Sequence, residues 1–162
     1  MIKNQNKKNK DHWSENTVFY QIYPSSFKDS NNDGRGDING IIEKLDYLND
    51  GTEDSLGIGA IILGPIYKSP MTDGGYDVTN HLEIDPLFGN FKDFDRLVAE
   101  AKKRNIKIIM DFIGNHTSIE HPWFIESKSS RNNLKRDWYV WKDGGKNNET
   151  PNNWLSVFGG SA

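Results

Sequence analysis

In the second half of the sequence stands the run Ile106-Lys-Ile-Ile-Met-Asp-Phe112. Its apolar side chains fall on both faces of an extended chain, and isoleucine is its commonest residue. Such a pattern is typical of a parallel strand that is covered on both sides. Two similar runs, Val18–Tyr23 and Ile58–Leu63, precede it. We therefore predict that all three runs form buried strands.

Helical periodicity fills both intervals between the predicted strands. Apolar residues recur there at spacings of three and four, which places them on one face of a helix. They are Ile38, Ile41, Ile42, Leu45 and Leu48 in the first interval and Phe91, Phe94, Leu97, Val98 and Ala101 in the second. Asp37 can cap the first helix, and Asn105 stands where a left-handed residue often ends a helix. The alternation predicts an α/β fold built from right-handed βαβ units.

Composition narrows the classes of function. The 162 residues carry 20 Lys and Arg against 23 Asp and Glu. Binding to nucleic acid needs clustered positive charge, so we expect no nucleic-acid partner. The sequence has no Cys, which excludes disulfides, thiolate nucleophiles and thiolate metal sites. It has no apolar stretch near the roughly 18 to 20 residues of a membrane span and no apolar targeting segment, so localisation is left open.

The two ends of the sequence differ from its middle. Residues 1–12 are polar and are predicted to form a disordered tail, whereas residues 13–116 carry the alternating strands and helices. Residues 117–162 lose helical periodicity and hold four of the five Trp residues. We predict that they begin a separate, irregular or β-rich insertion after the third strand.

The strongest local signal is the loop Asp29-Ser-Asn-Asn-Asp-Gly-Arg-Gly-Asp37. Oxygen side chains at alternate positions, with glycines that let the backbone curl, are typical of a loop that wraps Ca²⁺. The candidate ligands are the side chains of Asp29, Asn31, Asp33 and Asp37 and the carbonyl of Arg35. The loop is not a complete EF-hand, because Gly40 stands where that motif needs Glu. A solvated turn rich in Asp and Asn is the alternative interpretation.

Two further groups of residues are suited to a sugar. Asp111, Asn115 and His116 follow the third predicted strand, where side chains can hydrogen-bond a polar ligand above the sheet. Asp73 and Tyr76 flank two glycines in the long loop after the second strand, and they offer a carboxylate and a ring face. Taken singly, each group also fits a purely structural role at a strand end or in a loop.

In their order along the chain, these segments resemble the α-amylase superfamily of glycoside hydrolases (family 13). The resemblance is closest to its α-glucosidase branch, which contains insect maltases and oligo-1,6-glucosidases. It runs from about residue 11 to the end of the sequence. The motifs that carry it are Val18–Pro24, Phe27–Asn31, Gly64–Pro70, Gly75–Asp77, Ile84–Gly89, Asp111–Ser118 and Asn152–Gly159.

The resemblance implies about three βα units of a (β/α)₈ TIM barrel, followed by the start of an inserted domain. It implies an α-glucosidase that hydrolyses maltose- or sucrose-type α-glucosides by a retaining mechanism, with Ca²⁺ in the acidic loop. Asp73, Tyr76 and His116 are then expected to contact glucose in the first subsite, and Asp111 to organise the hydrogen bonds around them. The catalytic Asp, Glu and Asp of the family follow later strands and are not in this chain.

Three departures from the family pattern stand out. Gly114 replaces a usual Pro before Asn115 and His116, which is expected to loosen that loop. Ile62 and Gly64 stand where the family usually has Trp and Ser. Residues 51–55 look like an addition between the first helix and the second strand, either a tolerated surface insertion or an exon-boundary error in the gene model.

Two other functions compete with the enzyme. One is a non-catalytic homologue, such as the heavy subunit of an amino-acid transporter, which resembles the same barrel. Retention of Asp73, Tyr76 and His116 favours the enzyme over this alternative. The other is a stand-alone binding module, which we disfavour because three strands leave an open sheet edge. For the same reason we expect the chain alone to fold poorly and to hydrolyse no maltose.

Overall fold

The computed structural model describes residues 12–145 and 149–160. The chain divides between Ser118 and Ile119 into two compact units. We call residues 12–118 the strand unit and residues 119–160 the tryptophan unit. The division lies two residues after the boundary predicted from the sequence, between 116 and 117. Of the predicted N-terminal tail, residues 1–11 lie outside the described residues.

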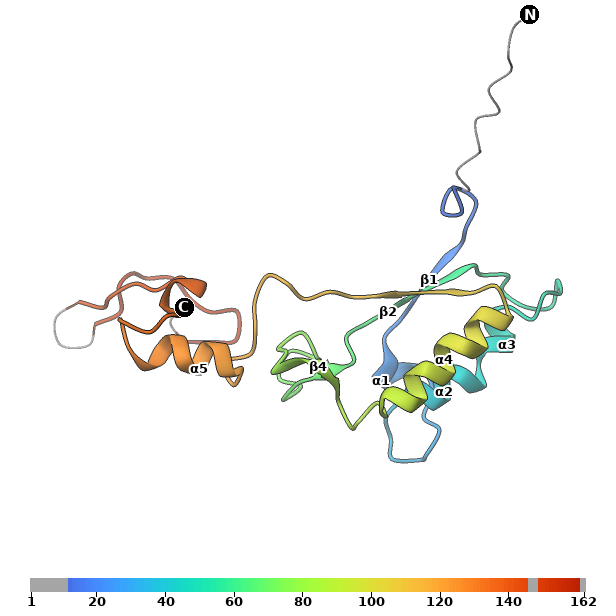
Figure 1. Ribbon diagram of the computed structural model, residues 1–162, viewed down its shortest axis with the longest axis horizontal. Coiled ribbons are helices and arrows are strands. Elements are labelled where there is room, and N and C mark those ends of the chain that lie inside the picture. Colours follow the sequence, from blue (N-terminus) through green and yellow to red (C-terminus); the bar gives the residue numbers. More distant parts are fainter. Residues whose placement is uncertain (1–11, 146–148, 161–162) are drawn as a thin grey trace, which may run out of the picture. The chain divides into compact units, whose positions relative to one another are not determined.

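A parallel sheet is the centre of the strand unit. It contains β1 (Phe19–Ile22), β2 (Ala60–Leu63) and β5 (Lys107–Met110) in the order β1-β2-β5 (Figure 1). Both neighbouring pairs are parallel. Each strand lies inside the run predicted for it and is one or two residues shorter at one or both ends. The predicted parallel α/β fold is therefore confirmed.

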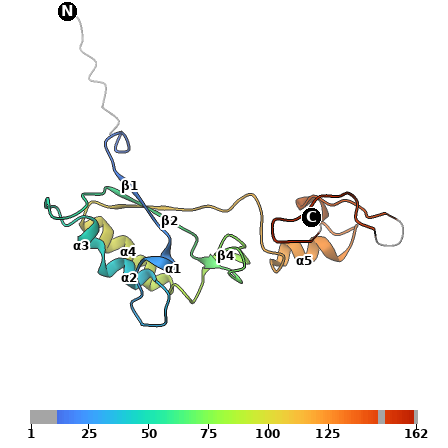
Figure 2. The same cartoon turned by 180° about the vertical axis from the view of Figure 1, so that it is seen from behind.

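Helices cover one face of this sheet. Figures 1 and 2 show α2 (Ile38–Glu43), α3 (Leu45–Leu48) and α4 (Phe91–Lys103) gathered on the same side of the strands. The strand register aligns two rows of side chains toward them, which are Tyr20, Ile61 and Ile108, and then Ile22, Leu63 and Met110. The buried core between sheet and helices is almost wholly aliphatic. It contains Ile22, Ile38, Ile41, Leu45, Leu48, Ile58, Ile61, Leu63, Ile66, Phe88, Leu97, Ala101 and Ile106.

The opposite face of the sheet carries the alternate residues. They are Phe19, Ala60 and Lys107 in one row and Gln21, Ile62 and Ile109 in the next. Phe19 keeps 40% of its surface exposed. The Trp13 ring lies 5.8 Å from the Phe19 ring, and the Lys107 ammonium stands 5.0 Å above Trp13. Trp13 therefore shields the N-terminal end of this open face.

The helices follow the predicted pattern with one exception. Asp37 caps α2, because its carboxylate accepts the Gly40 amide at 2.7 Å. The predicted first helix is interrupted at Lys44, where the backbone turns more tightly and the Lys44 amide bonds the Ile41 carbonyl. The α4 helix agrees with its prediction, and Asn105 after it is left-handed, with φ 57°. The short helix α1 (Pro24–Phe27) was not predicted.

Two local features lie in the loops of the strand unit. The loop after β2 contains an antiparallel hairpin of β3 (Tyr67–Lys68) and β4 (Asn80–Ile84), which the sequence analysis missed. Residues 51–55 form a surface loop, in which the Asp50 carboxylate accepts the Thr52 amide at 2.8 Å and hydroxyl at 2.7 Å. The structure thus places the apparent insertion outside the core.

The tryptophan unit is built on helix α5 (Pro122–Ser129) and the short 3₁₀ helix η1 (Arg136–Trp138). The prediction of an irregular segment is correct for much of it, but the β-rich alternative is wrong within residues 119–145 and 149–160. Helix α5 was not predicted, because it lacks an apolar stripe at helical spacing. Its start is instead marked by His121, whose ring accepts the Trp123 amide at 3.1 Å, and by Pro122.

Within the part of the chain that the structure describes, helices are too short or too polar to cross a membrane.

Candidate active site

The two predicted sugar-contacting residues of the long loop lie at the two ends of one tight turn. The Tyr76 amide donates to the Asp73 carbonyl at 3.1 Å. Both residues between them have positive φ, with Gly74 at 61° and Gly75 at 100°. These angles define a type I′ turn, which explains the Gly-Gly pair. The turn therefore brings the Asp73 carboxylate and the Tyr76 ring to neighbouring positions.

Side chains on both sides hold this turn in place. The Tyr23 hydroxyl, at the end of β1, donates to the Gly74 carbonyl. Gly64 makes room for Tyr23, since a β-carbon at Gly64 would stand 3.2 Å from the Tyr23 ring. Asp77 accepts the Ser69 hydroxyl at 2.7 Å and the Thr72 amide at 3.0 Å. The turn is thus fixed from β1 and from its own loop.

Tyr76 connects the turn to the end of β5. Its hydroxyl donates to Oδ2 of Asp111 at 2.9 Å. The Asp111 amide donates to the Leu63 carbonyl at 3.0 Å, which continues the pairing of β2 and β5 by one residue. The Tyr67 hydroxyl donates to the Asp111 carbonyl, also at 3.0 Å. Asp111 is therefore held at its amide, its carbonyl and its carboxylate.

We call residues 111–118 the exit segment, because they lead out of β5 toward the tryptophan unit. Two further contacts join this segment to the β3–β4 region. The His81 ring nitrogen Nε2 lies 3.0 Å from the Ile113 carbonyl, and the Ser118 amide donates to the Val78 carbonyl at 2.9 Å. The β3–β4 region therefore holds the exit segment at Asp111, Ile113 and Ser118.

His116 lies exposed in the exit segment. Its Nδ1 is 3.2 Å from Nδ2 of Asn115. A β-carbon at Gly114 would stand 2.6 Å from the exposed Phe112 ring, so a larger residue there requires that ring to move. Among the described residues, no hydrogen bond joins His116 to Asp73 or Tyr76. The structure thus brings Asp73, Tyr76 and Asp111 together directly, and His116 only through the exit segment.

Three side chains around the site have shifted pKa values. The hydrogen bond to Asp111 is the largest cause of a raised pKa at the Tyr76 hydroxyl. Burial, followed by the Asp111 charge, raises the pKa of Tyr67. Burial alone would raise the pKa of Asp77, but hydrogen bonds from Ser69 and from nearby amides lower it overall. Near neutral pH the two tyrosines therefore stay protonated donors and Asp77 stays a charged acceptor.

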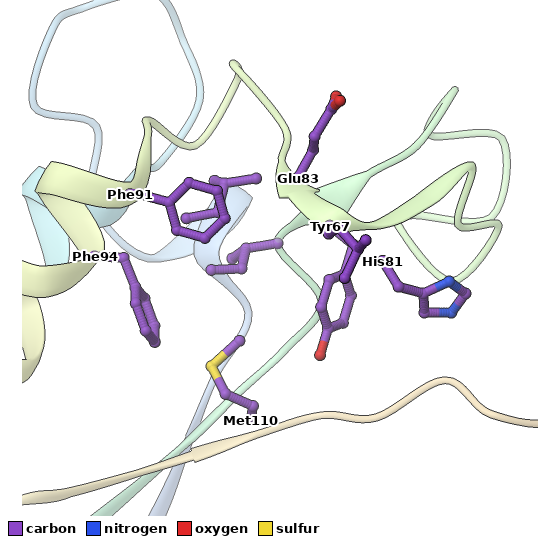
Figure 3. A pocket seen from close by; sticks show the side chains of 9 residues that line it. Tyr67, His81, Glu83, Phe91, Phe94 and Met110 are labelled. Carbon is purple, nitrogen blue, oxygen red and sulfur yellow. The ribbon is translucent and has the colours of Figure 1, made fainter.

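An apolar cavity of about 210 Å³ lies beside this site, between the hairpin, the start of α4 and the end of β5 (Figure 3). Figure 3 shows Phe91, Phe94, Met110 and the Tyr67 ring around it. The rings of Tyr67 and His81 are 5.8 Å apart. Asp73, Tyr76 and His116 do not line this cavity. The cavity is therefore bounded by residues that support the site, such as Tyr67 and His81, and not by its polar groups.

The acidic loop is organised by hydrogen bonds to its own backbone. Asp29 accepts the amides of Asn31, Asn32 and Gly34 at 2.7–3.0 Å. The Gly34 amide is the largest cause of a lowered pKa at Asp29. Asp37 is buried and uses both oxygens, on the Gly40 amide and on Ser30.

These contacts bear on the predicted Ca²⁺ ligands in different ways. In the described residues, no group of three or more His, Cys, Asp or Glu side chains is arranged to hold a metal ion. Asn31 and Asp33 are exposed and close together, with Nδ2 and Oδ2 3.1 Å apart. Of the predicted ligands, Asn31 and Asp33 are thus exposed, whereas Asp37 is buried with both carboxylate oxygens in use.

Sequence reasoning missed Tyr23, Tyr67 and His81, which contact the site's backbone. A signal was available for Tyr67, since it stands two residues after Pro65, which cannot donate a hydrogen bond to a neighbouring strand. Tyr23 and His81 act over long sequence separations, and their contacts depend on how the loops fold.

Comparisons with known proteins agree with this arrangement. A family model for the alpha-amylase catalytic domain matches residues 21–162. Over 150 residues the chain is 53% identical to the oligo-1,6-glucosidase of Parageobacillus thermoglucosidasius and 50% identical to a probable alpha-glucosidase of Rhizobium meliloti (strain 1021). The crystal structure of isomaltulose synthase from Erwinia rhapontici NX5 matches with a TM-score of 0.84 at 53% identity. Each match covers 93% of this chain and 26% of the relative.

Proposed function

We propose that this chain, which belongs to the alpha-amylase family of catalytic domains, forms the first part of an enzyme that hydrolyses α-glucosidic bonds of maltose- or sucrose-type sugars. The observation that carries the proposal is the 2.9 Å hydrogen bond between Tyr76 and Asp111. It joins the loop after β2 to the end of β5, where ligands of such folds bind. The names of the relatives, which include glucosidases and an isomaltulose synthase, support a glucosidase-type activity.

In the proposed site each residue has a distinct role. Asp73 accepts hydrogen bonds from glucose hydroxyls, and the Tyr76 ring packs against the apolar face of the sugar. Asp111 keeps Tyr76 in place through the hydrogen bond to its carboxylate. His116 donates a hydrogen bond from the exit segment. The bond cleavage itself, by a retaining double displacement, requires carboxylates that lie outside these 162 residues.

The test is an assay of the full-length protein, by which we mean the complete product of the gene that encodes this sequence. We expect it to release glucose from maltose, sucrose or an aryl α-glucoside. Asp73→Asn should lower kcat/KM about tenfold to a hundredfold, because hydrogen bonds to charged groups contribute about 1.5–3 kcal/mol. Asp46→Asn on the exposed surface of α3 is the matched control and should leave kcat/KM within about twofold.

The outcome also separates the enzyme from its main rival. A full-length protein that is folded but cleaves none of these substrates would contradict the proposal. It would then favour a non-catalytic homologue of the transporter-subunit kind.

For the acidic loop we propose an exposed Ca²⁺ site formed by Asp29, Asn31, Asp33 and the Arg35 carbonyl. The support is the alternation of oxygen groups and the open position of Asn31 and Asp33. Added Ca²⁺ should then raise the melting temperature, and Asp33→Ala should remove that rise. A melting temperature that is the same in millimolar Ca²⁺ and in EDTA would contradict this proposal and favour the alternative, a solvated turn.

A further inference from the structure

The hydrogen-bond ladder between β2 and β5 stops at a proline. The Lys107 amide donates to Gly59 and the Asp111 amide to Leu63, each at 3.0 Å, as in an evenly spaced parallel pair. By the same spacing, the Asp111 carbonyl should accept the amide of residue 65. Residue 65 is Pro, which has no N–H. The ladder thus leaves one carbonyl without its backbone donor, at the residue that leads into the exit segment.

The Tyr67 hydroxyl fills this position. It lies 3.0 Å from the Asp111 carbonyl, and the pair is partly buried. Its ring lines the apolar cavity on one side and lies 5.8 Å from the His81 ring (Figure 3). An unpaired buried carbonyl destabilises the structure. The Tyr67 hydroxyl gives the Asp111 carbonyl the hydrogen bond that the backbone of Pro65 cannot give.

We propose that Tyr67 is a positioning residue of the sugar site, and that it replaces the missing ladder donor of Pro65 and so fixes the orientation of Asp111 and the exit segment. This inference rests on the function proposed above. Asp111 receives one tyrosine hydroxyl on its carbonyl and another, from Tyr76, on its carboxylate. Loss of the first bond lets the backbone of Asp111 rotate and so shifts the carboxylate that holds Tyr76.

The experiment compares three variants of the full-length protein with the wild type. Tyr67→Phe removes only the hydroxyl and keeps the ring at the wall of the cavity. Pro65→Ala restores a backbone N–H, and the double variant asks whether that N–H can replace the hydroxyl. Tyr47→Phe, on the exposed surface of α3, is the control for loss of a tyrosine hydroxyl.

Two readouts are used. The first is hydrogen–deuterium exchange of residues 112–118, which can be measured whether or not the protein cleaves glucosides. The second is kcat and KM for an α-glucoside. We expect Tyr67→Phe to speed exchange and to lower kcat/KM about tenfold, the effect of one hydrogen bond. The addition of Pro65→Ala should reverse most of both effects, whereas Tyr47→Phe should change neither.

Unchanged exchange in Tyr67→Phe would overturn the inference, and so would equal effects in Tyr67→Phe and in the double variant. A wild-type protein without activity would instead refute the proposed function, and the exchange data would still decide whether Tyr67 holds the exit segment. A loss of folding in Tyr67→Phe that Pro65→Ala repairs would support the ladder argument.

Discussion

The strand unit and the tryptophan unit are stabilised in different ways. The strand unit has an aliphatic core, which requires mainly apolar side chains of suitable size at the right positions. The tryptophan unit is organised around Ser127, a fully buried polar residue. The Ser127 hydroxyl accepts the Trp141 indole N–H at 2.9 Å and donates to the Arg136 carbonyl at 3.2 Å. The Arg136 guanidinium lies 4.3 Å from the centre of the Trp141 ring.

Aromatic contacts complete the tryptophan unit. Phe124 stacks on Trp141 at 5.4 Å and meets Tyr139 edge to face at 5.2 Å, and Trp123 meets Trp138 edge to face at 5.2 Å. Such contacts depend on geometry more than on buried area. The strand unit is therefore specified by a pattern of apolar residues, whereas the tryptophan unit is specified by individual partners.

The largest expected effect tests the aliphatic core. Leu97 on α4 is fully buried, so Leu97→Ala leaves a cavity between helix and sheet. We expect it to lower the free energy of unfolding by about 3 kcal/mol. Native-state hydrogen exchange of α4 in the full-length protein measures this. Val98→Ala on the same helix is the control, because 40% of Val98 is exposed, and it should cost much less. Equal costs would show that helix propensity, not the core, stabilises α4.

A smaller effect is expected from the polar centre of the tryptophan unit. Ser127→Ala removes the partner of both the Trp141 indole and the Arg136 carbonyl. We expect a loss of about 1–2 kcal/mol, seen as faster hydrogen exchange of α5. Ser129→Ala, on the exposed end of the same helix, is the control and should change exchange little. If both variants behaved alike, the unit would depend on its rings rather than on Ser127.

The smallest expected effect depends on pH and concerns the polar loop of the strand unit. Because the pKa of Asp77 is lowered below 3.8 in the folded protein, the charged Asp77 stabilises the loop above this pH. The contribution is lost as pH falls through the lowered pKa.

The measurement is the ratio of exchange rates of residues 70–76 in Asp77→Asn and in the wild type. We expect this ratio to exceed one at pH 7, to begin to fall near pH 3.8, and to approach one only as pH falls through the lowered pKa of Asp77. Asp54→Asn in the exposed 51–55 loop should give a ratio of one throughout. A ratio for Asp77→Asn that does not change with pH would refute the role of its charge.

The contrast between the two units also explains what the sequence could predict. In the strand unit, periodic apolar residues located β1, β2, β5 and α4, because burial of one face dictates the period. The same rule joined α2 and α3 into one helix, since apolar spacing continues across Lys44 while only the backbone changes. In the tryptophan unit, α5 carries no such stripe, so periodicity could not reveal it.

The candidate site was predictable to a similar degree. Asp73 and Tyr76 could be singled out because they offer a carboxylate and a ring face beside two glycines, and Asp111 because it ends a strand. The supports Tyr23 and His81 were not found, because their partners, the carbonyls of Gly74 and Ile113, are 51 and 32 residues away in the sequence. Backbone carbonyls carry no sequence signal, so a side chain that serves them looks unremarkable until the fold is known.

The exit segment has a consequence for synthesis. Hydrogen bonds join it to Leu63, Tyr67, Tyr76, Val78 and His81, which precede it in the chain. A growing polypeptide leaves the ribosome from its N-terminus, so these partners are already outside when residues 111–118 emerge. We therefore expect the contacts around Asp111 to form during translation, once residues 111–118 have left the ribosome.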